Sequence, residues 1–170
     1  MWHRVIFSVC CVILCGACGN SMAMQLEKRW KLLEAFGQDL RTIRNRIEFE
    51  RIPLSAIMKE LHDSTVGLLW DGVAEKLYSS DFASIWKNEL YDLHGSLLAP
   101  LKEEDMDVLT EFGRRLGEAE SVSMQLSQID MTLERLRECA LETKSEIGKK
   151  SRLFRTLGTM AGFAIMIVLW

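Results

Sequence analysis

Apolar residues recur at steps of three and four along most of the chain, which is the period of an amphipathic α-helix. The first stretch predicts a helix over residues 26–50 that should end near Ile52, because Pro53 fits only the first turn of a following helix. A second, short helix is expected directly after the proline. The predicted inner faces are Leu26, Trp30, Leu33, Phe36, Leu40, Ile43 and Ile47 in the first helix and Leu54, Ile57, Met58 and Leu61 in the second.

Three more helices are predicted between residues 63 and 117. The first starts at Asp63-Ser64, the second follows the capping cluster Ser79-Ser80-Asp81, and the third opens with Glu103-Glu104-Asp105 and ends at Gly117. Acidic residues favour a helix N-terminus electrostatically, and glycine favours a C-cap. The inner faces are Val66, Leu69, Trp70, Val73 and Leu77, then Phe82, Ile85, Trp86 and Leu90, then Met106, Leu109, Phe112 and Leu116.

The last helix, over residues 119–152, has the most regular pattern. Its apolar positions alternate steps of four and three, as in a coiled-coil seam, and charged residues occupy the other faces. The seam is Val122, Leu126, Ile129, Leu133, Leu136, Ala140, Thr143 and Ile147. Strand-like alternation is lacking and the chain has only two prolines, so the sequence predicts an all-α fold, an antiparallel helical bundle.

Charge is missing from both ends of the chain. Apart from Arg4, all charged residues lie between Glu27 and Arg155. The uncharged run from Val5 to Met24 would be about 30 Å long as a helix, close to the thickness of a hydrocarbon core. The terminal run, with Arg155 reaching the headgroups, would span about 27 Å. We therefore predict membrane helices at residues 1–24 and 153–170, flanking a helical domain at residues 25–152.

Other interpretations of the ends remain open. The first run also fits a cleaved signal peptide, because a short apolar core is followed by small residues. A lipoprotein signal would use Cys18, but Cys15 stands three residues earlier, where leucine is usual. The C-terminal run could instead be a buried core helix, although its lack of a polar face favours the membrane.

Basic residues predict the orientation of the central domain. Lys28, Arg29 and Lys31 follow the first apolar run, Lys149 and Lys150 precede the second, and only Arg4 lies on the other side. The positive-inside rule places such flanks in the cytoplasm. We expect a multi-pass protein of the cell membrane with a cytoplasmic central domain.

Composition excludes two other classes of protein. The net charge of −3 gives no indication of nucleic-acid binding. Four of the five cysteines lie in the first apolar run, which leaves Cys139 alone in the middle. No disulfide can form within the central domain, so a disulfide-rich secreted fold is not expected.

No arrangement of residues predicts catalysis, a cofactor or a metal site. The glycines do not form a phosphate-binding loop, and His3, His62 and His94 lack metal-ligand spacing. Cys139 is expected to be a packed helix residue, and the carboxylates are expected on solvated helix faces. Trp30, Trp70 and Trp86 stand at core spacing, whereas Trp2 and Trp170 suit a membrane interface. We therefore expect a protein that is not an enzyme.

Several segments together carry a family resemblance. Leu101 to Asp105 is followed by Val108-Leu109 and by Phe112-Gly113-Arg114-Arg115-Leu116-Gly117; Gln125, Ile129, Leu133-Glu134, Lys149-Lys150 and Arg155-Thr156-Leu157-Gly158 come later. Ile47-Glu48-Phe49 with Pro53-Leu54 matches the end of the first helix. In order and spacing the chain resembles the stage III sporulation protein AB family of spore-forming bacteria. It departs from the family pattern at Ile52 and Ala119-Glu120.

The resemblance implies a role in the channel complex that joins mother cell and forespore. Members are similar to the cytoplasmic domain of the inner-membrane platform protein of type II secretion systems and type IV pili. The implied partners are the AA-type ATPase of the same complex and neighbouring membrane subunits, and a homo-oligomer is possible. The alternatives are a small membrane-anchored regulator of a signalling protein and an envelope protein with a cleaved signal peptide.

Overall fold

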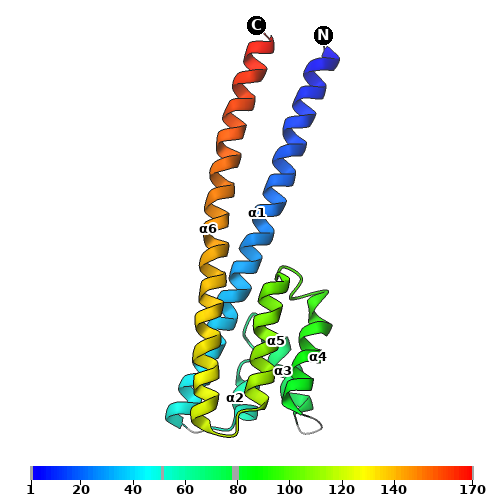
Figure 1. The fold of residues 1–170 in the computed structure, drawn as a ribbon. Helices are drawn as coiled ribbons and strands as arrows, with labels where there is room; N and C mark the ends of the chain where they lie inside the picture. Colours follow the sequence, from blue (N-terminus) through cyan, green and yellow to red (C-terminus); the bar gives the residue numbers. More distant parts are fainter. Residues whose placement is uncertain (1, 51, 78–80, 170) are drawn as a thin grey trace. The chain divides into compact units, whose positions relative to one another are not determined.

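Every described element of the protein is helical. The computed structural model describes the backbone of residues 2–50, 52–77 and 81–169 and the side chains of residues 24–50, 52–77 and 81–149. The elements are α1 (Trp2–Asn45), the π-helix η1 (Arg46–Glu50), α2 (Leu54–Glu60), α3 (Gly67–Lys76), α4 (Phe82–His94), α5 (Glu103–Gly117) and α6 (Val122–Leu169) (Figure 1). The predicted all-α class is confirmed for these residues.

The chain divides into two compact units. One is Arg29–Leu141, and the other combines Met1–Lys28 with Glu142–Trp170. Among the residues whose side chains are described, no helix is long and apolar enough to cross a membrane. The predicted membrane segments, residues 1–24 and 153–170, lie outside this part of the chain except for Met24.

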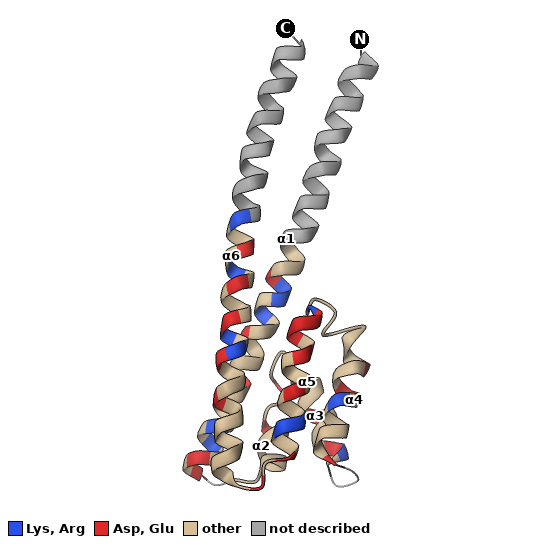
Figure 2. Ribbon diagram, viewed as in Figure 1, with Lys and Arg blue, Asp and Glu red and all other residues tan. Residues whose placement is uncertain are grey.

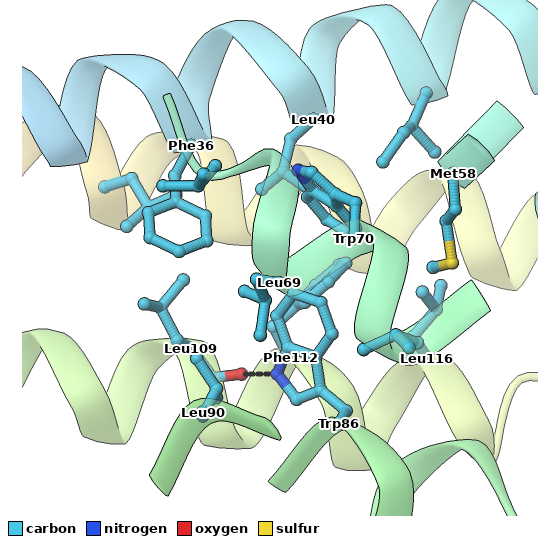
Figure 3. Packing of buried hydrophobic residues seen from close by; sticks show 14 of the residues in the cluster. Phe36, Leu40, Met58, Leu69, Trp70, Trp86, Leu90, Leu109, Phe112 and Leu116 are labelled. Atoms are coloured by element: carbon cyan, nitrogen blue, oxygen red, sulfur yellow. Dashed lines mark hydrogen bonds between the residues drawn. The ribbon is translucent and has the colours of Figure 1, made fainter. Parts of the chain in front are cut away.

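The core of the Arg29–Leu141 unit follows the predicted inner faces closely. All four helices α2 to α5, together with parts of α1 and α6, contribute to one hydrophobic cluster (Figure 3). The residues that are buried as predicted are Leu33, Phe36, Leu40, Ile43, Ile47, Ile57, Met58, Val66, Leu69, Trp70, Val73, Ile85, Trp86, Leu90, Met106, Leu109, Phe112, Leu116, Ile129, Leu136 and Ala140. Removing this apolar surface from water is the main force that holds the helices together.

Trp86 occupies the centre of the core. Its ring centroid lies 5.1 Å from that of Trp70, 6.0 Å from that of Phe82 and 5.3 Å from that of Phe112. Its indole N–H donates to the Leu109 carbonyl oxygen at 2.7 Å (Figure 3). A buried indole needs such an acceptor, and the second lone pair of a helix carbonyl oxygen supplies it. The prediction that Trp70 and Trp86 are core residues is confirmed, and Trp30 is partly buried against the same core.

Helices α4 and α5 approach closely at two glycines. A Cβ placed on Gly113 would lie 2.0 Å from Cδ1 of Trp86, and one on Gly117 would lie 3.3 Å from Cβ of Ala83. The start of α4 therefore faces the end of α5, so this pair is antiparallel. Only glycine leaves room for the indole at position 113.

The predicted start of α3 at Asp63-Ser64 is wrong, because this helix begins at Gly67. Residues 61–66 form turns instead. The Ser64 hydroxyl donates to Oδ2 of Asp39 at 2.6 Å, and the same oxygen accepts the Trp70 indole N–H at 2.7 Å. These bonds tie the turn and α3 to α1. A side chain at position 67 would meet the His62 carbonyl oxygen at 2.0 Å, which explains the glycine there.

Two predicted positions at the helix ends also differ. The first helix does not continue as an α-helix to residue 50, because its last turn widens into the π-helix η1. Val122, the first predicted seam residue of the last helix, is exposed rather than buried. It is the first residue of α6, directly after the α5–α6 connection.

The Asp39 carboxyl gives a pH-dependent prediction. Burial raises its pKa above the ordinary value of 3.8, against the smaller lowering by the hydrogen bonds from Ser64 and Trp70. A raised folded-state pKa means that the stability contributed by this group is largest at low pH and is lost as pH rises through the folded value. Asp39→Asn keeps an oxygen acceptor without the charge, so we expect a higher melting temperature than wild type at pH 7.

Thermal melts of both full-length proteins at pH 7 and pH 4 measure this effect. The advantage of the variant should shrink at pH 4, where the wild-type carboxyl is closer to being protonated. A variant that is less stable than wild type at pH 7, or equally advantaged at both values, would contradict the assignment.

Candidate interaction surface

A buried ion pair fixes the first helix of the Arg29–Leu141 unit to the start of α5. Arg29 and Asp105 have side-chain exposures of 1% and 0%. The guanidinium binds both carboxylate oxygens, with Nε at 2.7 Å from Oδ2 and Nη2 at 2.8 Å from Oδ1. Asp105 Oδ2 also accepts the backbone N–H of Lys102 at 2.9 Å, which caps the helix. A bidentate, fully desolvated pair of this kind fixes geometry more strongly than a surface pair.

The expectation that the carboxylates lie on solvated faces is therefore wrong for Asp105, Asp39 and Glu89, which are all buried. Each has a partner that offsets at least part of the cost of removing its charge from water. Arg29 pairs with Asp105, Ser64 and Trp70 bond Asp39, and Lys76 pairs with Glu89. Sequence periodicity does not reveal such partners, because they come from distant segments.

The residues with potential for chemistry do not converge. His62 Nε2 lies 3.0 Å from Oδ1 of Asp63 at the surface, His94 ends α4, and His3 lies outside the residues whose side chains are described. Cys139 is partly buried against the core, as expected. In residues 24–50, 52–77 and 81–149, no three His, Cys, Asp or Glu side chains form a group that could hold a metal ion. Sequence analysis had predicted no catalytic, cofactor-binding or metal-ligating residue.

The most exposed large apolar side chain in this part of the chain belongs to the π-helix. Phe49 is 78% exposed, whereas Ile47, two residues earlier, is buried. A π-helix adds a residue to the turn and is often found at functional sites. Within it, Ile47 lies in the core and Phe49 is exposed to solvent. Sequence analysis named Phe49 only within the segment Ile47-Glu48-Phe49 that carries the family resemblance, and did not predict it as an interaction residue.

One arginine holds the carboxylate that precedes Phe49. Arg44 Nη1 lies 2.6 Å from Oε2 of Glu48, and its Nε lies 2.6 Å from Oδ1 of Asp130 in α6. The hydrogen bond to Asp130, and then that to Glu48, raises the pKa of Arg44 further above its ordinary value. Arg44 thus links the π-helix to α6.

A second arginine holds the carboxylate that follows Phe49. Arg46 Nη1 lies 3.1 Å from Oε2 of Glu50, and its Nη2 lies 2.9 Å from Oε2 of Glu60 at the end of α2. We call Phe49 with these six charged residues, Arg44, Glu48, Asp130, Arg46, Glu50 and Glu60, the η1 surface. Three elements besides η1 itself, namely α1, α2 and α6, supply it.

A shallow groove lies between α5 and α6. An apolar floor with polar and charged borders lines it: Val108, Glu111, Phe112, Arg115, Gln128, Met131, Thr132 and Arg135. Glu111 accepts hydrogen bonds from Arg114 and Arg115, which lower its pKa to about 2. This carboxylate therefore stays ionised at any physiological pH. The groove is one more surface that could contact a protein.

Charges of both signs are interspersed along α1, α5 and α6, with acidic residues at the start of α5 and basic residues near its end (Figure 2). A surface of this kind does not match the continuous basic stripe typical of nucleic-acid binding. Exposed aromatic residues such as Phe49 are of a type that is enriched at protein–protein contacts, although single exposed apolar side chains are also common.

The comparisons with known proteins identify one family. The family described as stage III sporulation protein AB matches residues 4–170, which is nearly the whole chain. No curated protein and no solved structure matches the chain.

Proposed function

Because the chain belongs to the stage III sporulation protein AB family, a family of sporulation proteins, we propose that it is a non-enzymatic platform component of the channel complex between mother cell and forespore. In this role it docks the cytoplasmic, secretion-type AA-type ATPase of the complex. The observation that carries the proposal is the match over residues 4–170, which includes both apolar ends as well as the helical domain.

The proposed organisation is an antiparallel helical bundle between two membrane helices. The chain is uncharged from Val5 to Met24 and from Thr156 to Trp170, and the helices α1 and α6 extend to Trp2 and Leu169. Basic residues flank the apolar ends on the side of the central domain, which favours a cytoplasmic position under the positive-inside rule. The protein would lie in the mother-cell membrane around the forespore.

A docking role fits the surface of the Arg29–Leu141 unit. The buried Arg29–Asp105 pair and the tryptophan core make a fixed scaffold, and the η1 surface presents an aromatic side chain on it. Similarity of the family to the platform proteins of type II secretion systems supports an ATPase partner. Other membrane subunits of the channel, or further copies of this chain, would complete the assembly.

Binding between purified full-length chain in detergent and the purified ATPase of the same complex tests the proposal. We expect the ATPase to be retained on the immobilised chain. A membrane protein of similar size and charge, immobilised in the same way, is the control. Equal retention on both would contradict the platform role and leave a membrane-anchored regulator as the better interpretation.

A further inference from the structure

We draw no further inference here: the strongest candidate, the shallow groove between α5 and α6 with its apolar floor of Val108, Phe112 and Met131, has charges of both signs along its borders, and nothing in the structure shows what covers it.

Discussion

Replacing Asp105 by asparagine should lower the free energy of unfolding by about 3–5 kcal/mol, which is a large part of the stability of a domain of this size. The asparagine can still accept the Lys102 backbone N–H, but the positive charge of Arg29 remains at 1% exposure without its counter-charge. Urea unfolding of the full-length chain, followed by tryptophan fluorescence, measures the loss.

Two further variants show whether the charge causes the effect. Glu104→Gln removes an exposed carboxylate from the same helix turn and should change stability by less than about 0.5 kcal/mol. The double variant Arg29→Met with Asp105→Asn removes both buried charges and should regain much of the lost stability. An Asp105→Asn protein as stable as Glu104→Gln would show that the pair does not hold α1 to α5.

Gly113→Ala should destabilise the protein by about 2–3 kcal/mol, the effect of overpacking a core combined with a weakened hydrogen bond. The new Cβ would lie 2.0 Å from Cδ1 and 2.4 Å from Cγ of Trp86. The indole cannot move aside without losing the 2.7 Å bond to the Leu109 carbonyl or its contacts with Trp70 and Phe112. Urea unfolding measures the free energy, and near-UV circular dichroism should show altered tryptophan packing.

Gly37→Ala is the matched control for this substitution. A Cβ at Gly37 in α1 would have no atom within 4 Å, so only the change in helix propensity acts, which favours alanine by up to about 1 kcal/mol. The two substitutions should therefore change stability in opposite directions. Destabilisation of similar size at both positions would mean that loss of glycine, and not contact with the indole, is responsible.

Apolar periodicity was sufficient to predict most of the core. The stripe Leu33, Phe36, Leu40 and Ile43 is buried because a helix that packs on one side buries the residues that recur every three or four positions on that side. Periodicity is less reliable at helix ends. Val122 continues the stripe into the first turn of α6 but is exposed, and α3 begins later than its polar residues suggested.

The buried ion pair was missed although the sequence contains a signal for it. Arg29 precedes Leu33 by four residues, and Asp105 precedes Leu109 by four, so both charged residues lie in phase with the apolar stripes of their helices. A charged residue in phase with an apolar stripe is normally interpreted as a sign that the buried part of the helix ends there. Only the tertiary fold brings these two segments, 76 residues apart, into contact.

The η1 surface could not have been predicted from spacing. A π-helix inserts one residue into the turn, and the sequence of residues 46–50 contains no glycine or proline to indicate it. One ion pair joins Arg46 of η1 to Glu60 of α2, and another joins Arg44 of α1 to Asp130 of α6, far away in the sequence. The exposure of Phe49 itself agrees with its place outside the inner-face spacing.

The side of the membrane on which the central domain lies tests the proposed function most directly. A reporter active only in the cytoplasm, and a second active only outside, should be fused after Gly117, at the end of α5. The account predicts activity of the cytoplasmic reporter alone. Activity of the external reporter alone would contradict the account, because it would favour a cleaved signal peptide in residues 5–24 and remove any contact with a cytoplasmic ATPase.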